Sequence, residues 1–138
     1  MSILNFLLVT VLVGLVDGTQ VKFSDPLFKG FIESRADGNV VLMYRRGPVH
    51  GILSIDAISR IDIGYERGRP FPLSITLKNG QKLEAESERR TFLRVSGATS
   101  NNEAISISHP DPVSVPVRIT TRSPDRKDDL TIQFLEFN

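Results

Sequence analysis

The sequence predicts an all-β fold, a single antiparallel sandwich or small barrel of about nine or ten short strands after an N-terminal leader. Three observations predict this class. Apolar and polar residues alternate through most of the chain, which is the two-residue period of half-buried strands. Turn signals recur roughly every 8 to 12 residues, as they do in sandwiches and barrels. Beyond the leader, no segment keeps an apolar stripe at helical spacing over several turns.

Length and composition indicate one globular domain, which we place at residues 19–138. The chain has 138 residues, 40% of them hydrophobic and 24% charged, and a formal net charge of +1. So small a charge gives no strong attraction to nucleic acid or to an anionic membrane. Cysteine is absent, which excludes disulfides, thiolate metal ligands and a cysteine nucleophile. The domain must therefore depend on its hydrophobic core for stability.

The N-terminal segment has the character of a secretory leader. Ile3 to Val16 is almost wholly apolar and is shorter than the roughly 20 residues of a membrane-spanning helix. Val16 and Gly18 are small enough for a cleavage site after Gly18, although the usual positive charge at the start is missing. We predict a signal peptide over residues 1–18 and an exported protein, periplasmic or secreted. An uncleaved N-terminal membrane anchor and a buried first strand are the alternatives.

The first half of the domain reads as short strands separated by turns. We expect strands at residues 19–23, 27–34, 40–44, 49–55 and 60–65. Ser24-Asp25-Pro26 predicts a turn between the first two strands, and Asp56 to Ser59 predicts a single helical turn before the fifth. The unbroken apolar run from Val40 to Tyr44 indicates a strand that is buried on both faces or lies beneath a covering segment.

A β-hairpin follows in Leu73 to Ala85, around an Asn-Gly turn. Because side chains alternate between the two faces of a strand, the number of residues in the loop decides which side chains of the two strands share a face. A two-residue loop would pair Ile75 with a glutamate, whereas a three-residue loop pairs Ile75 with Leu83 and keeps one face apolar. The longer loop also places Gly80 at the left-handed bulge position that such loops require.

The second half continues the strand pattern. The charged segment Glu84 to Arg90 resembles a helix in composition, but the hairpin parity extends through Ser87, so we predict a strand. Further strands are expected at residues 91–95, 105–107 and 113–121 and from residue 130, with a loop at 96–102. Pro116 lacks an N–H group, so its strand should lie at an edge or contain a bulge.

Catalytic signals are weak. The chain has two histidines, His50 and His109, without metal-ligand spacing, and we expect both to be surface or turn residues. The serine-hydrolase pattern G-x-S-x-G is absent. A small hydrolase or isomerase, our first alternative function, would use Asp56, Asp62 or His109. We predict neither a metal nor a cofactor.

Arginine supplies 12 of the 17 basic residues. Arginine favours paired, hydrogen-bonded roles, and we expect mainly cross-strand pairs with the interspersed acids. The candidate binding residues are Arg45, Arg46, Arg89, Arg90 and Arg94. Single-stranded nucleic-acid binding, the second alternative, would use Arg89 to Arg94, where Phe92 and Arg94 share a face. The leader argues against nucleic acid as a partner.

Our main hypothesis is an exported, non-enzymatic module of binding or structural role. Such a module would recognise a protein or a cell-envelope polymer through loops or through an edge strand.

Overall fold

The computed structural model confirms the all-β class, and it describes residues 10–88, 91–111, 127 and 130–138. These residues form one antiparallel sheet of eleven strands, and the 3-10 turn η2 (Ile55–Ala57) precedes β6. The strands are β1 (Thr10–Leu15), β2 (Gln20–Gly30), β3 (Ile32–Ser34), β4 (Val40–Arg46), β5 (Val49–Ser54), β6 (Ile58–Ile63), β7 (Pro72–Leu77), β8 (Lys82–Ser87), β9 (Leu93–Thr99), β10 (Ala104–His109) and β11 (Ile132–Phe137).

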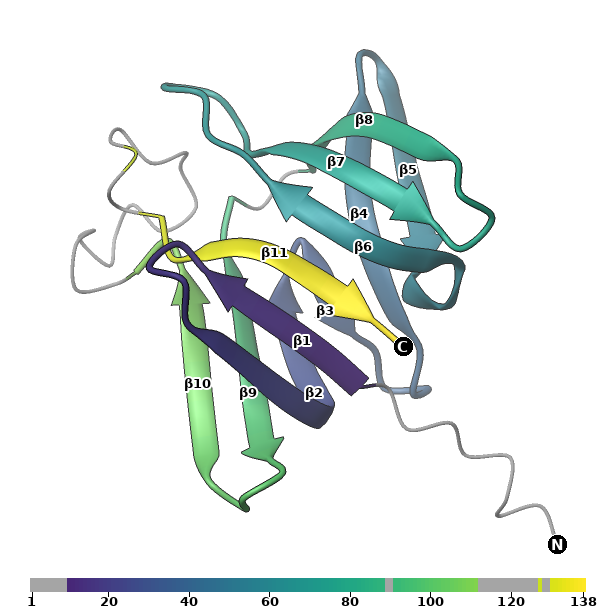
Figure 1. Ribbon diagram of the computed structural model, residues 1–138. Helices are drawn as coiled ribbons and strands as arrows, with labels where there is room; N and C mark the ends of the chain where they lie inside the picture. The colour runs from purple at the N-terminus through teal and green to yellow at the C-terminus, as the bar shows by residue number, and fades with distance from the viewer. Residues whose placement is uncertain (1–9, 89–90, 112–126, 128–129) are drawn as a thin grey trace, which may run out of the picture.

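The sheet curls strongly (Figure 1), and its strand order shows why. The order is β10-β9-β2-β1-β11-β6-β7-β8-β4-β3, with β5 paired to β4 outside this path. Only Phe31 separates β2 from β3 along the chain. The part of the path that begins at β2 and ends at β3 therefore returns to the same segment of the chain. The structure thus has the barrel-like form rather than two stacked sheets.

The interior of this curled sheet is one hydrophobic core. Its side chains alternate along the strands with outward-facing polar residues, as the period of two requires. The largest fully buried side chains are Phe23, Phe31, Phe71, Ile32, Leu42, Ile58, Ile61, Leu73, Ile75, Leu93, Ile132 and Leu135. Buried aliphatic and aromatic groups of this size contribute roughly 1.5–3 kcal/mol each before chain entropy is counted.

The predicted leader contains a strand of this sheet. β1 lies between β2 and β11, with Val11 opposite Phe23 on one side and Phe137 on the other. Val11 and Val13 are fully buried, which agrees with the buried-strand alternative for this part of the chain. Cleavage after Gly18 would remove β1 from the sheet. Export itself stays a prediction.

The hairpin register is confirmed. β7 and β8 pair Ile75 with Leu83 and Leu73 with Ala85. The loop closes through a hydrogen bond from the Leu77 N–H to the Gln81 carbonyl at 2.8 Å, and Gly80 has a φ of +89°. β8 extends to Ser87 as a strand, so the charged segment is not helical there.

Two boundaries differ from the prediction. Ser24 to Pro26 is not a turn between strands but a bulge within β2, marked by a register shift against β9 between Ser24 and Leu27 and by a φ of +53° at Asp25. β9 continues to Thr99 through the predicted loop, because β10 pairs with it along this length. The predicted strand at 113–121, with Pro116, lies outside the described residues.

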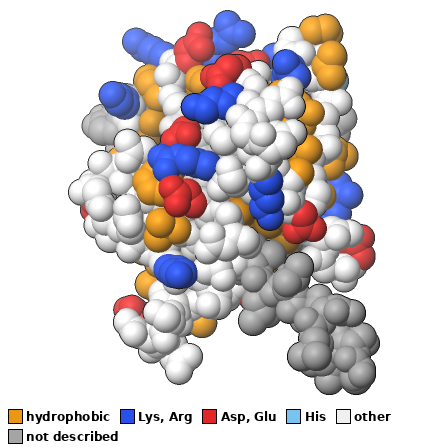
Figure 2. Space-filling view, turned by 45° about the vertical axis from the view of Figure 1, so that its right-hand side comes forward, with side chains coloured by type: hydrophobic (Ala, Val, Ile, Leu, Met, Phe, Trp, Pro, Cys, Tyr) orange, Lys and Arg blue, Asp and Glu red, His pale blue; other side chains and the backbone are white. Residues whose placement is uncertain are grey.

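Outward-facing charges pair across strands as expected. Arg60 of β6 binds Glu136 of β11 at 2.5 Å, and Arg45 of β4 binds Glu86 of β8 at 3.3 Å. Figure 2 shows basic and acidic side chains interspersed over one face of the molecule. The Arg60 guanidinium also lies 4.1 Å from the centre of the Phe134 ring. The same ring covers Gly14, where a Cβ atom would overlap it.

We expect Ile75→Asp to unfold the domain and Thr76→Asp to leave it folded. Ile75 is fully buried, and a carboxylate there has no partner and loses the apolar contribution of about 1.5–3 kcal/mol. Thr76 faces the opposite side of the same strand. Circular dichroism during thermal unfolding measures both, and equal behaviour of the two variants would contradict the register.

A second matched pair tests β1. Val13→Asp should abolish cooperative unfolding of the chain, because Val13 is fully buried, whereas Val16→Asp should have little effect, because Val16 is 55% exposed. Both proteins are expressed from Met1 and compared by urea unfolding. A stable Val13→Asp protein would mean that β1 is dispensable.

Candidate functional site

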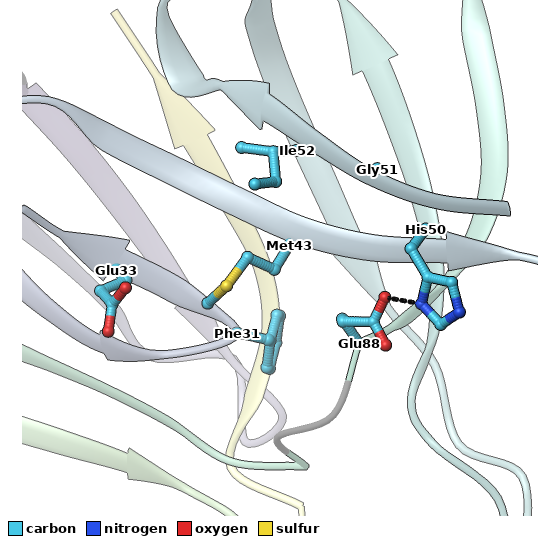
Figure 3. A pocket seen from close by; sticks show the side chains of 7 residues that line it. All are labelled: Phe31, Glu33, Met43, His50, Gly51, Ile52 and Glu88. Atoms are coloured by element: carbon cyan, nitrogen blue, oxygen red, sulfur yellow. Dashed lines mark hydrogen bonds and ion pairs between the residues drawn. The ribbon is translucent and has the colours of Figure 1, made fainter.

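A groove of about 440 Å³ lies on the outer face of the sheet, across β3, β4 and β5. Its described lining residues are Phe31, Glu33, Met43, His50, Gly51, Ile52 and Glu88. Figure 3 shows Glu33 at one end and His50 with Glu88 at the other, with Met43 and Phe31 between them. The groove therefore has an apolar middle and polar ends.

Strand register places these side chains on one face. Met43 of β4 lies directly opposite Ile52 of β5, and Arg45 opposite His50, two residues further along each strand. Since alternate residues share a face, Met43, His50 and Ile52 all point outward. Leu42, on the opposite face of β4, is fully buried in the core.

Backbone hydrogen bonds fix the floor of the groove. The Phe31 N–H donates to the Phe92 carbonyl at 3.1 Å, and the Phe31 carbonyl accepts from the Met43 N–H at 2.8 Å. On the same strand, the Met43 carbonyl accepts from the Glu88 N–H at 3.1 Å. Phe31 and Glu88 thus flank Met43 at one edge of β4, and their positions depend on the closure of the sheet.

His50 and Glu88 form the polar end. The His50 ring Nδ1 hydrogen-bonds the Glu88 carboxylate, and since a carboxylate only accepts, Nδ1 carries the proton. The Glu88 side chain is 14% exposed and that of His50 is 61% exposed. The largely covered Glu88 carboxylate therefore orients the exposed His50 imidazole beside the groove.

The unpaired edge of β5 lies beside the groove. Within the described part of the chain, β5 pairs with β4 alone. Val49 and Ile52 on this strand are 59% and 60% exposed, two of the largest apolar exposures in the described structure. The outward N–H and C=O groups of an edge strand are open to pairing with another chain.

The three candidate catalytic residues have separate environments. Asp62 binds Arg60 at 3.0 Å, and this hydrogen bond, ahead of the contribution from Glu136, raises the pKa of Arg60. Asp56 is exposed in the 3-10 turn, where its N–H donates to the Ser54 hydroxyl at 3.2 Å. None of Asp56, Asp62 and His109 lines the groove.

His109 is fully buried at the end of β10, so the expectation of a surface or turn histidine is wrong. Its Nδ1 accepts from the backbone N–H groups of Thr131 at 3.1 Å and Ile132 at 2.8 Å. The ring packs against Phe71, with centroids 4.6 Å apart. Desolvation lowers the pKa of His109 from 6.5 to about 3, so it is neutral at pH 7 and links β10 to the start of β11.

The candidate binding arginines do not form a single described patch. Arg45 pairs with Glu86 on β8, and Arg46 is exposed at the end of β4. Arg94 of β9 lines a second depression of about 450 Å³ together with Lys29. Arg89 and Arg90 lie outside the described residues.

Sequence reasoning missed the groove. Glu33 was unremarkable in a short apolar run, and His50 and Glu88 are far apart along the chain and share no motif. The one available signal was the continuous hydrophobicity around Met43, which indicated a covered strand.

No cluster of three or more potential metal-binding side chains occurs among the described residues.

None of the described residues belongs to a helix of the length and hydrophobicity that crossing a bilayer requires.

Comparisons with known proteins return no matching family, no similar curated protein and no similar solved structure.

The buried histidine predicts how stability depends on pH. Because the pKa of His109 is lower in the folded state than in the unfolded state, the unfolded chain binds more protons between pH 6.5 and 3. The contribution of His109 to the free energy of unfolding is complete above pH 6.5. Below pH 6.5 this contribution decreases by about 1.4 kcal/mol for each pH unit. Urea unfolding between pH 7.5 and 5.5 measures this slope.

His109→Asn is the matched variant, because the amide oxygen replaces the Nδ1 acceptor without titrating. We expect it to be less stable at every pH and to lose the slope between pH 6.5 and 5.5. An unchanged slope would show that His109 does not titrate on unfolding.

Proposed function

We propose that this protein is a non-enzymatic binding module that captures an extended segment of a protein partner along β5. The observation that supports this proposal is the edge of β5 that no described strand pairs, which lies beside an open groove and exposes Val49 and Ile52. Addition of a strand to a sheet edge provides main-chain hydrogen bonds, and side-chain pockets beside the edge provide specificity.

The composition of β5 favours this role. Edge strands are usually protected from pairing by lysine, proline, inward charges or bulges. β5 has the sequence V-H-G-I-L-S, and it pairs with β4 over six consecutive residues without a register shift. Such a regular and uncharged edge is suited to accepting another strand.

The arrangement supports binding more than catalysis. The carboxylate-oriented imidazole of His50 has the form of a general base. However, the described lining offers no serine, threonine or lysine to act as a nucleophile, and Asp56, Asp62 and His109 each have a structural environment elsewhere. The exposed apolar side chains along β5 have no catalytic role and suit a docking surface.

Selection from a phage-displayed library of random dodecapeptides tests the proposal. We expect saturable binders that lose affinity roughly tenfold or more with Ile52→Asn, since about 1.5 kcal/mol or more of apolar contact is lost. Leu27→Asn, on β2, is the control, because Leu27 is 67% exposed and lies outside the groove. Isothermal titration measures both.

Failure to recover a saturable binder, or equal losses in the two variants, would contradict strand capture at β5.

A further inference from the structure

The charge pattern of the groove indicates the chemistry of its partner. Two carboxylates, Glu33 and Glu88, lie at its two ends, and its described lining includes no lysine or arginine. Phe31, Met43 and Ile52 form the apolar stretch between them. A matching ligand group would be long and apolar along its stem and positively charged at its end.

Lysine and arginine side chains have this form. Their methylene stems pack on apolar surface while the charged head reaches a polar site. Methionine adapts to irregular shapes, so Met43 suits a floor on which such a stem lies. Both carboxylates take part in other contacts within the chain, but a carboxylate has about four lone-pair sites and can accept from a ligand in addition.

The geometry of strand addition explains why a long side chain is needed. A strand added to the free edge of β5 would lie about 4.8 Å from it. A residue opposite Ile52 on that strand would point to the same face as Ile52 and Met43. Met43 lies one strand further away, on β4, so only a long side chain that extends over β5 can bring a charged head toward the Glu88 carboxylate, which itself reaches His50 of β5.

Glu88 is the better anchored of the two carboxylates. Its N–H donates to the Met43 carbonyl at 3.1 Å, and its side chain is 14% exposed. A charge-assisted hydrogen bond to a partly desolvated, fixed carboxylate is stronger than one to a mobile surface group. The groove therefore has one firm acceptor for a cationic head.

We propose that the groove selects an extended peptide carrying a lysine or arginine, whose side chain extends over β5 toward Met43 and whose charged head binds the Glu88 carboxylate, while Glu33 at the other end adds to the negative potential of the groove. This proposal rests on strand capture at β5, which supplies the peptide backbone interactions, and it identifies the partner as a basic segment.

The same dodecapeptide library tests the proposal on the full chain. We expect selected peptides to carry one lysine or arginine at a fixed place among residues that favour strands. Replacing that residue by norleucine should weaken binding roughly 3- to 10-fold, which corresponds to a partly exposed ion pair of about 1 kcal/mol.

Carboxylate variants assign the effect to the groove. Glu88→Gln should abolish most of the difference in affinity between the basic peptide and the norleucine peptide. Glu33→Gln should reduce this difference in affinity. Glu103→Gln removes the same charge from the exposed turn between β9 and β10 and should leave the difference unchanged.

The outcomes separate the two proposals. Peptides that depend on Ile52 but show no preference for a basic residue, or a preference insensitive to both glutamine variants, would overturn the basic-segment proposal and leave strand capture intact. No peptide dependent on Ile52 would overturn both. A concentration-dependent dimer that Ile52→Asn abolishes in sedimentation would replace the basic peptide by a second copy of this chain.

Discussion

The structure depends on a single bend in the chain, where β2 becomes β3. Gly30 has a φ of +132°, a value that L side chains rarely adopt, and a Cβ atom there would overlap the Phe92 carbonyl oxygen. Before the bend, β2 pairs with β1 and β9, and after it, β3 pairs with β4. The continuous segment from β2 to β3 therefore belongs to two parts of the sheet. The curled sheet closes because Gly30 permits the turn and Phe31 joins both sides through its backbone.

The groove is a consequence of that closure. β4 pairs with β5 along one edge, while β3 and β8 share the other. Phe31 and Glu88 meet at Met43, where these two strands approach each other, and both hydrogen-bond its backbone. The same arrangement leaves β5 outside this path, with one edge that no described strand pairs. The edge at which we propose binding and the groove beside it therefore come from the same topological feature.

Polar groups are divided between structural and surface roles. His109 is enclosed by the core, where two backbone donors satisfy its Nδ1 and hold the start of β11. Arg60, with Asp62 and Glu136, binds β6 to β11 on the outer face. Asp62 and His109 are candidate catalytic residues in the sequence, yet the contacts of Asp62 with Arg60 and of His109 Nδ1 with the backbone of β11 give each a structural role. The groove instead combines an exposed imidazole, carboxylates and apolar contacts, a composition that suits the binding role we propose.

The sequence by itself determined the features that depend on neighbouring residues, namely the all-β class, most strand positions and the register of the β7–β8 hairpin. In that hairpin the two-residue period of strands allows only the three-residue loop, which keeps Ile75 and Leu83 on the same face. It did not determine the role of Thr10 to Leu15, because a short apolar run has the same composition in a leader and in a buried central strand. The groove lay further beyond reach, since Glu33, His50 and Glu88 come together only through the pairing of β4 with three strands distant in the chain. Such long-range pairing is decided by the closure of the whole sheet, and no local pattern of residues records it.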